Sequence, residues 1–464
     1  MKKNQTNLVS RRKFLGSLSI LGVSYFILPR YSRADAPSGD ADVVDIAPVW
    51  AGHPVNFVLL TKDNQQFVAY YDDQRQMTLA LRTLGDKTWA FKKLPTTIGW
   101  DTHNYIVMAF DPTGCLHVSG NMHAVPLVYF RGSKPLDIDS VTAVPSMTGQ
   151  NENSVTYPRF FNGPSGDLLF SYRDGSSGNG NNYFNIYNPT SQTWSRLIDV
   201  PLMEGKDDSG SGQHMNAYMQ GPKTGPDGYY HVSWVWRNTP DASTCHDLSY
   251  MRSKDMVHWE TVDGQPLTLP ITGTTQGVVV DPIPVNGGIL NTMGQIGFDA
   301  NKQPIISYTK YDANGKTQLY LARYENGAWQ LHLASDWNVR YEFSGGGTFA
   351  PPIGVAPVEL RGDKMCIQIV DKELGNDFWE IDPQTMKLVG RMPTSSQNKV
   401  WWQFSKVEST FPGMRVKWLS DTGQAADGKT YKLRWETLPE NRDLPRPEPW
   451  PPPSTLRVIG VSAA

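Results

Sequence analysis

Four residues between positions 103 and 173 are of types that could carry out acid–base chemistry on an anionic sugar: His103, His123, Tyr157 and Arg173. Abstracting the C5 proton of a uronic acid requires a cation on the carboxylate, a base at C5 and an acid at the O4 leaving group. Arginine offers a carboxylate a planar fork, and histidine titrates near neutral pH. We expect the pKa of Tyr157 to be lowered beside Arg173, so that it serves as acid, base or both. This elimination needs no metal, so we predict that no cofactor is required for catalysis.

The two histidines flank a predicted hairpin turn, residues 111–114. Pairing Phe110 with Leu116 across this turn sets His103 directly opposite His123. Directly opposed residues have Cβ atoms about 5 Å apart on the same face of a sheet. A slip of one residue would separate the pair, so their meeting depends on this register.

Tyr157 and Arg173 flank the next predicted hairpin in the same way. Pairing Phe161 with Leu169 sets Tyr157 opposite Arg173. If the two hairpins stand side by side, all four side chains converge at one end of their sheets. The glycine-rich segment 175–180 that follows leaves space for a ligand there.

Each of these residues also has an ordinary structural interpretation. A histidine in a strand is most often a hydrogen-bonded structural residue, and we assign His117 to that role. Tyr157 precedes Pro158 and could simply pack, and Arg173 precedes Asp174 and could form a local ion pair.

Further polar residues are candidate substrate-binding groups. Asn104 and Asn121 stand beside the two histidines. A second polar set lies at the corresponding strand ends of the next repeat and could bind neighbouring sugars or make structural loop contacts. It comprises His214, Asn216, Tyr218 and Arg237.

The elements that must hold these residues repeat along the chain. A polar turn rich in Asp, Asn and Gly stands between two short apolar runs at seven places, at intervals of about 50 to 75 residues. The runs are rich in Val, Ile, Tyr, Phe and Trp at period two, which is typical of strands. The turns lie near Asp63, Asp111, Gly166, Asp227, Asp299, Asp363 and Asp427.

A second hairpin, often ending in Trp, follows most of these turns, so each repeat predicts four strands. The predicted fold is all-β, a seven-bladed β-propeller of four-stranded antiparallel blades, which protects strand edges by radial packing. We predict a single propeller domain over residues 37–464, with the chain termini sharing a blade. The proline-rich segment 445–453 is predicted to be an extended strap over the surface. The alternative is two packed β domains.

The first 36 residues predict an export signal rather than a folded element. Arg11 and Arg12 precede Phe14 and a short apolar run, which resembles a twin-arginine signal. The run has about 12 residues, whereas a membrane span needs about 20. We therefore expect export to the periplasm or beyond, with no membrane attachment after signal removal; an uncleaved anchor is the alternative.

Composition limits the partners of the exported chain. Charged residues make up 19% and aromatic residues 11%, which excludes a disordered chain. The three cysteines, Cys115, Cys245 and Cys366, are too few and too scattered for a disulfide scaffold. Residues 1–36 hold seven of the 43 Lys and Arg and one of the 45 Asp and Glu, so the remainder has a net charge of −8. Nucleic acid is therefore not an expected partner, and an anionic ligand must be met by a local cluster.

Four motifs carry a family resemblance. They are DTHN at 101–104, GNMH at 120–123, TYPRF at 156–160 and SYRDGSSGNG at 171–180. They resemble the signatures of seven-bladed propellers with BNR repeats that include ulvan lyases. The resemblance implies that His103 and His123 lie at the cleaved bond, that Tyr157 is the acid/base tyrosine, and that Arg173 neutralises the uronate carboxylate.

Such lyases resemble one another in carrying a structural metal. The segment with His231, Cys245 and His246 is the one Cys/His cluster in the sequence that could hold zinc or calcium, although a buried Cys is more often inert.

The predicted function is therefore a polysaccharide lyase that cleaves an ulvan-like, uronate-containing polysaccharide by β-elimination, acting as a monomer. The alternatives are a rhamnosidase-like or sialidase-like propeller hydrolase and a noncatalytic carbohydrate-binding propeller. A sialidase needs three arginines on one carboxylate, and only Arg173 and Arg237 are expected at this end of the sheets.

Overall fold

Short strands make up almost all the regular structure of this computed structural model, which describes residues 41–206, 214–349, 353–371, 375–393 and 396–462. The one α-helix in that part of the chain is α1 (Ser396–Gln403), and two short 3-10 turns span Ile138–Ser140 and Ala242–Thr244. No helix among the described residues is long and apolar enough to span a membrane. The predicted signal, residues 1–36, lies outside the described residues.

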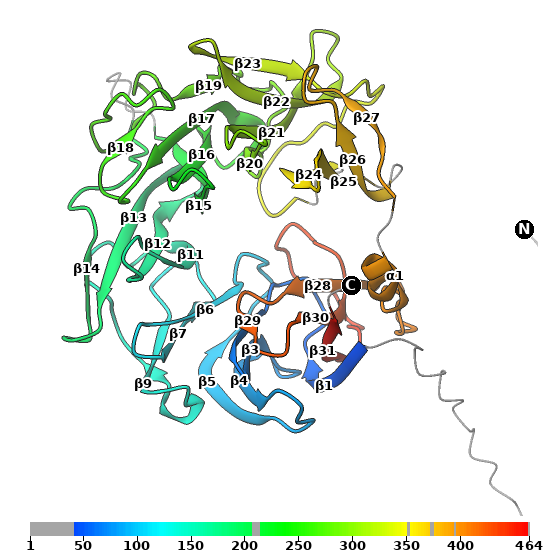
Figure 1. Ribbon diagram of the computed structural model, residues 1–464. Helices are drawn as coiled ribbons and strands as arrows, with labels where there is room; N and C mark the ends of the chain where they lie inside the picture. Colours follow the sequence, from blue (N-terminus) through cyan, green and yellow to red (C-terminus); the bar gives the residue numbers. More distant parts are fainter. Residues whose placement is uncertain (1–40, 207–213, 350–352, 372–374, 394–395, 463–464) are drawn as a thin grey trace, which may run out of the picture. The chain divides into compact units, whose positions relative to one another are not determined.

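The strands form seven sheets, which follow one another around a central axis (Figure 1). The first sheet in chain order contains β2 (Val58–Asp63), β3 (Gln65–Tyr71), β4 (Gln76–Thr83) and β5 (Ala90–Thr97). The second contains β6 (Ile106–Phe110), β7 (Cys115–Gly120), β9 (Tyr129–Pro135) and β10 (Thr142–Ala143). The third contains β11 (Val155–Asn162), β12 (Leu168–Ser176), β13 (Asn179–Asn188) and β14 (Thr193–Arg196). The fourth contains β15 (Asn216–Thr224), β16 (Tyr230–Arg237), β17 (Cys245–Ser253) and β18 (Trp259–Glu260). The fifth contains β20 (Gln295–Phe298), β21 (Pro304–Tyr311), β22 (Thr317–Glu325) and β23 (Ala328–Leu333). The sixth contains β24 (Ile353–Arg361), β25 (Lys364–Asp371), β26 (Gly375–Ile381) and β27 (Leu388–Arg391).

The last sheet closes the ring with strands from both ends of the chain. Its order is β1 (Ala41–Val49), β31 (Ser454–Ser462), β30 (Lys429–Thr437) and β28 (Arg415–Ser420). β1 pairs antiparallel with β31 from Ala41 opposite Val461 onward, which confirms the predicted shared blade. All described strands belong to one compact unit.

Three sheets gain a fifth strand that the repeat pattern does not predict. β8 (His123–Val125) joins β11, β19 (Val279–Asp281) joins β17, and β29 (Gln424–Ala425) runs parallel to β2. The all-β antiparallel prediction is otherwise confirmed. β8 matters most for function because it carries His123.

Aspartate side chains explain the recurrent turns. Oδ1 of Asp111 accepts hydrogen bonds from the backbone N–H of Thr113 and of Cys115 at 2.9 and 3.0 Å. Asp299 makes the same pair of contacts at the β20–β21 turn. Such Asx turns replace backbone partners within the turn, and Gly114 supplies the required positive φ of 86°.

Aromatic rings fill the spaces between neighbouring sheets. Phe57, before β2, stacks on Trp435 of β30 with ring centroids 4.6 Å apart, and Phe67 of β3 meets Phe110 of β6 at 5.0 Å. Burial of such rings stabilises the ring of sheets through the hydrophobic effect. The three cysteines are buried and free, as expected from their number.

The proline-rich segment 445–453 has no strand, as predicted, but it is not a terminal tail. It leads into β31, the second strand of the last sheet. Trp450 of this segment packs edge-on against Trp50 and Trp100, with the guanidinium of Arg75 among the three rings.

Candidate active site

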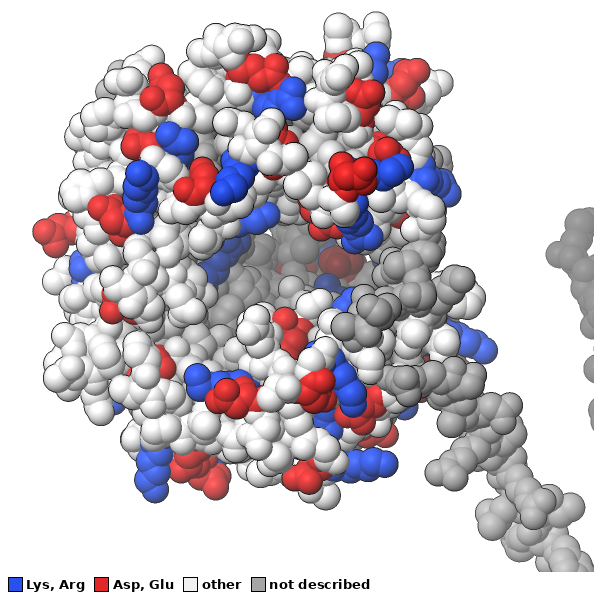
Figure 2. All heavy atoms as spheres, viewed as in Figure 1, with Lys and Arg blue, Asp and Glu red and all other residues white. Residues whose placement is uncertain are grey.

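A cavity of about 720 Å³ brings together all four residues predicted to do chemistry. His103 comes from the segment before β6, His123 from β8, Tyr157 from β11 and Arg173 from β12. We call it the histidine cavity. Figure 2 shows one face of the molecule hollowed at its centre, with acidic and basic side chains interspersed around the hollow rather than in one basic patch. Local charges therefore decide what such a cavity can bind.

The two histidines meet, but not within one ladder. β6 and β7 pair in the predicted register, yet the ladder ends at Ile106 opposite Gly120. His123 belongs to β8 instead and lies opposite Thr156. The imidazole rings of His103 and His123 nevertheless stack, with centroids 4.0 Å apart. Loops beyond the hairpin, rather than cross-strand pairing, bring them together.

The carboxylate of Asp101 holds both histidine rings. Its Oδ1 lies 2.7 Å from Nδ1 of His103, and its Oδ2 lies 2.5 Å from Nδ1 of His123. A carboxylate only accepts, so both Nδ1 atoms donate, and Nε2 of a neutral His123 is left as an acceptor. Burial alone would lower the pKa of His103, but hydrogen bonds to Asp101 and Asp443 outweigh it and raise that pKa to about 9. His103 is therefore protonated at neutral pH.

A β-bulge places Tyr157 beside Arg173 rather than opposite it. The register shifts between Thr156 and Arg159, so that Thr156 faces Arg173. Pro158 has no N–H to give to the ladder, and Tyr157 adopts a φ of 58°, both of which suit a bulge. The predicted direct pairing is therefore wrong. The two side chains still form a cation–π contact, because the guanidinium carbon of Arg173 lies 5.0 Å from the ring centroid of Tyr157.

Arg173 is a buried cation whose donors are largely unused. It is 1% exposed, and its Nη2 donates to Oγ1 of Thr156 at 3.1 Å. Its Nε and Nη1 have no hydrogen-bond partner among the described residues. No ion pair with Asp174 forms, so that structural alternative is wrong. Buried donors without partners are costly, and an anionic ligand in the cavity would satisfy them.

Tyr157 is a neutral phenol, contrary to the expected lowered pKa. Burial raises its pKa well above the ordinary value, and the neighbouring Tyr218 adds to this, while Arg173 only partly opposes it. Tyr218 stands in edge contact with Tyr157, with centroids 5.9 Å apart, and its hydroxyl lies 2.7 Å from Oγ of Ser177. Burial wins over one nearby cation, so Tyr157 is suited to donate a proton.

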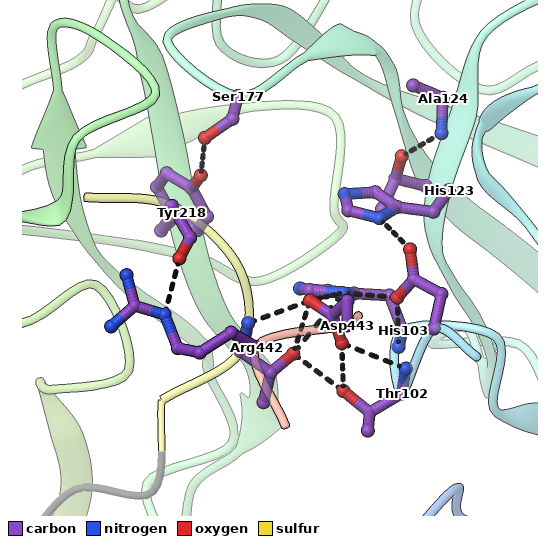
Figure 3. A network of polar contacts seen from close by, with 12 residues as sticks. Thr102, His103, His123, Ala124, Ser177, Tyr218, Arg442 and Asp443 are labelled. Atoms are coloured by element: carbon purple, nitrogen blue, oxygen red, sulfur yellow. Dashed lines mark hydrogen bonds and ion pairs between the residues drawn. The ribbon is translucent and has the colours of Figure 1, made fainter. Parts of the chain in front are cut away.

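Asp443, from the connection between β30 and β31, completes the support of His103. Its Oδ2 lies 3.4 Å from Nδ1 of His103. Its Oδ1 accepts from the backbone N–H of Thr102 at 3.1 Å, and its Oδ2 from that of Thr348 at 2.7 Å. Figure 3 shows Asp443 between Thr102 and His103. One carboxylate thus ties together three segments that are far apart in the sequence.

Replacing Asp443 by asparagine is expected to change how stability depends on pH. The pKa of His103 is raised to about 9 in the folded protein from an unfolded value of about 6.5. The stabilisation of the folded protein by this proton is therefore fully present below about pH 6.5 and lost as pH rises through about 9, and it amounts to roughly 3 kcal/mol. Asp443→Asn should shift the loss to lower pH by about one unit, because only Asp101 would remain.

The melting temperatures of the parent protein and of Asp443→Asn, measured from pH 6 to 10, show this shift. Asp363→Asn, at an exposed turn, is the control and should follow the parent protein. Identical pH profiles for the parent and Asp443→Asn would contradict the role of Asp443 in holding the proton on His103.

The predicted substrate-binding residues divide into two groups. Arg237 lines the histidine cavity, where its Nη1 donates to the hydroxyl of Tyr218 at 3.3 Å. Asn121 turns away and donates to Thr97 of β5. Asn104 and the exposed His214 do not line the cavity. The structure therefore brings Arg237, with its neighbour Tyr218, to the four central residues.

The three residues predicted as a metal site do not gather. His231 is buried and bonded on both ring nitrogens, to Tyr250 at 2.5 Å and Asp227 at 2.9 Å. Cys245 lies toward the other end of the same β16–β17 ladder. Both ring nitrogens of His246 are also hydrogen-bonded. The metal-site prediction is wrong because adjacent antiparallel strands carry His231 and Cys245 to opposite ends of the sheet, although they are close in sequence.

Another group, Asp101, His103 and His123, is the one set among the described residues that could hold a metal ion, with ligand atoms within 4.8 Å of one another. As arranged, both Nδ1 atoms donate to the carboxylate. A bound cation would have to displace those protons, so the geometry fits a hydrogen-bonded cluster better than a metal site.

Comparison with known proteins identifies the family of this chain. Residues 65–337, more than half of the sequence, match the model of the BNR repeat-containing family. The chain belongs to this family. Among its relatives is the ulvan lyase short isoform of Alteromonas sp. (strain LOR), which is 28% identical over 148 residues. That match spans 30% of this chain and only 28% of the relative.

Two solved lyase structures have the same fold as this BNR repeat-containing protein. The crystal structure of polysaccharide lyase Uly1 covers 90% of this chain and 99% of its own, with a TM-score of 0.57 at 16% identity. A PL25 ulvan lyase, from a new family of polysaccharide lyases, covers 90% and 96%, also with a TM-score of 0.57, at 14% identity.

Sequence reasoning did not assign a role to Asp101 or Asp443. Asp101 could have been found, because it lies two residues before His103 in the quoted DTHN motif. No sequence signal pointed to Asp443, because it lies 341 positions from Thr102, which it contacts. Thr348 likewise lies 245 positions from His103.

Proposed function

We propose that this protein is a polysaccharide lyase that cleaves a uronate-containing, ulvan-like polysaccharide by β-elimination and leaves a C4–C5 unsaturated uronate. The observation that carries the proposal is Arg173, a buried guanidinium with two unpartnered nitrogens lining the histidine cavity. A uronate carboxylate matches that fork, and its neutralisation is what makes the C5 proton removable.

Each residue takes a role that its surroundings support. Arg173 and the protonated His103 bind the uronate carboxylate and stabilise the charge that develops there. His123 donates from Nδ1 to Asp101, which leaves Nε2 free to accept the C5 proton. Tyr157, kept neutral by burial, protonates O4 as the bond to the leaving sugar breaks.

The polymer class rests on relatives as well as on chemistry. One solved PL25 ulvan lyase is bound to a glucuronate–rhamnose 3-sulfate unit. Sulfated ulvan is therefore the substrate that we propose to try first. We further propose that the protein is exported by its twin-arginine-type signal, meets this polymer in the periplasm or outside the cell, and acts as a monomer.

A hydrolase is the less favoured function because the cavity lacks its machinery. Glycosidases use two carboxyl groups flanking the scissile bond. Among the described residues that line the histidine cavity there is no Asp or Glu, and Asp101 is occupied by the two histidine rings.

Ultraviolet absorbance on mixing the protein with ulvan tests the proposal. A β-elimination creates a C4–C5 double bond conjugated with the carboxylate, so absorbance should rise with time. The same polymer with its carboxylates reduced to alcohols should give no product, because reduction removes the group that acidifies the C5 proton. Comparable cleavage of both polymers without an unsaturated product would overturn the lyase in favour of a hydrolase.

A further inference from the structure

A second cavity lies next to the first. It has a volume of about 520 Å³ and is lined by two arginines, Arg340 and Arg442. We call it the arginine cavity. Phe349 lines both this cavity and the histidine cavity, so the two cavities adjoin at this side chain.

Arg442 is held in one orientation. Its guanidinium stacks on Phe349 at 4.1 Å, its Nε donates to the carbonyl of Gly346 at 2.7 Å, and its Nη2 donates to that of Ser344 at 3.0 Å. Its Nη1 has no partner among the described residues. An arginine fixed in this way has already lost its rotamer freedom and can bind an anion at low entropic cost.

The backbone around Arg442 is unusual. Arg442 and Asp443 both adopt left-handed φ values, 56° and 62°, although neither is glycine. Gly347 permits this arrangement, because a Cβ there would lie 2.4 Å from the carbonyl oxygen of Arg442. Figure 3 shows Asp443 at the histidines and the Arg442 guanidinium pointing away from them. Backbone strain of this kind is typical of functional sites.

Arg340 supplies the second cation. Its guanidinium lies 3.8 Å from the ring centroid of Tyr311, and its Nη1 donates to the carbonyl of Gly315 at 2.7 Å. Glu342 accepts from its Nε at 2.9 Å but is 75% exposed. Two arginines against one exposed carboxylate leave the arginine cavity with net positive charge within an acidic protein.

We propose that the arginine cavity is a subsite that binds a second anionic group of the polymer, a sulfate ester or a uronate carboxylate on a sugar beyond the cleaved bond. This inference rests on the proposed lyase function for its substrate. A sulfate ester and a carboxylate each present two acceptor oxygens that match the forked donors of an arginine. A cavity adjoining the reacting site gives binding energy from a part of the substrate that does not react.

Kinetics of Arg340→Gln and Arg442→Gln on ulvan test the subsite. Each variant should raise KM by about three- to tenfold with kcat nearly unchanged, because charge-assisted hydrogen bonds outside the reacting centre are lost. The effect should vanish on the shortest oligosaccharide that is still cleaved. Arg361→Gln is the matched control, since Arg361 also stacks on a phenylalanine, Phe378, and pairs with a glutamate, but lies outside both cavities. Arg340 does not contact the segment that supports Asp443, so its variant keeps the test valid if Arg442→Gln disturbs the fold.

Binding without turnover separates this inference from the proposed function. In an Arg173→Ala background, migration through gels containing ulvan should be retarded, and retardation should weaken when Arg340→Gln is added. Desulfated ulvan and carboxyl-reduced ulvan show which anion is bound, since loss of retardation in one of them identifies the group. Retardation that depends on Arg340 supports the subsite even if no polymer is cleaved. Unchanged KM and unchanged retardation in both arginine variants would overturn it.

Discussion

Replacing Arg173 by alanine is expected to abolish measurable turnover while leaving the fold intact. Arg173 is the buried cation that faces the histidine cavity with unpartnered Nε and Nη1 atoms. Without it, charge developing on the uronate carboxylate loses its main stabiliser, a loss of about 3–4 kcal/mol or roughly a hundred- to a thousandfold in rate by analogy with one oxyanion donor. The measurement is the rate of unsaturated product formation, read by ultraviolet absorbance.

Arg131→Ala is the matched control for that experiment. Arg131 is a hydrogen-bonded, half-buried arginine, which donates to the hydroxyl of Tyr187 at 3.0 Å, but it lies outside the histidine cavity. Its loss should affect stability and not rate. Near-normal turnover in a well-folded Arg173→Ala protein would remove Arg173 from the mechanism.

Replacing Tyr157 by phenylalanine is expected to lower kcat by at least about a hundredfold, the lower range for general acid–base catalysis. The hydroxyl is the only atom removed, and burial keeps it protonated. Substrate binding should persist, because Arg173 keeps its position on β12. The measurement is kcat together with binding of ulvan by gel retardation.

Tyr129→Phe provides the comparison. Tyr129 is buried, and its hydroxyl lies 2.8 Å from Nδ1 of His117, away from the cavity. That variant should lose stability and keep its rate. A Tyr157→Phe protein that turns over like Tyr129→Phe would assign the acid role to another group, and Tyr218 would be the next to replace.

Several features of the site follow from local sequence. The bulge at Tyr157 follows from Pro158, which cannot donate to a ladder. The hairpin turns follow from aspartates such as Asp111, whose side chain satisfies the backbone of its own turn. The pKa of Tyr157 could not be predicted in the same way, because it depends on how much of the molecule surrounds the ring.

The sequence by itself determined the all-β repeat, the shared last blade and the four residues that line the histidine cavity. These depend on short-range patterns: period-two burial, turn residues and spacing around a hairpin. The tertiary structure alone decided that Asp101 joins the two histidines, that Asp443 supports His103 from the far end of the chain, and that His231 and Cys245 lie apart. Ring closure sets the contact of Asp443, because it brings loops hundreds of residues apart to one cavity and no local pattern records which loops will meet there. The other two depend on where each strand ladder ends, which sets the position of β8 and the ends of β16 and β17.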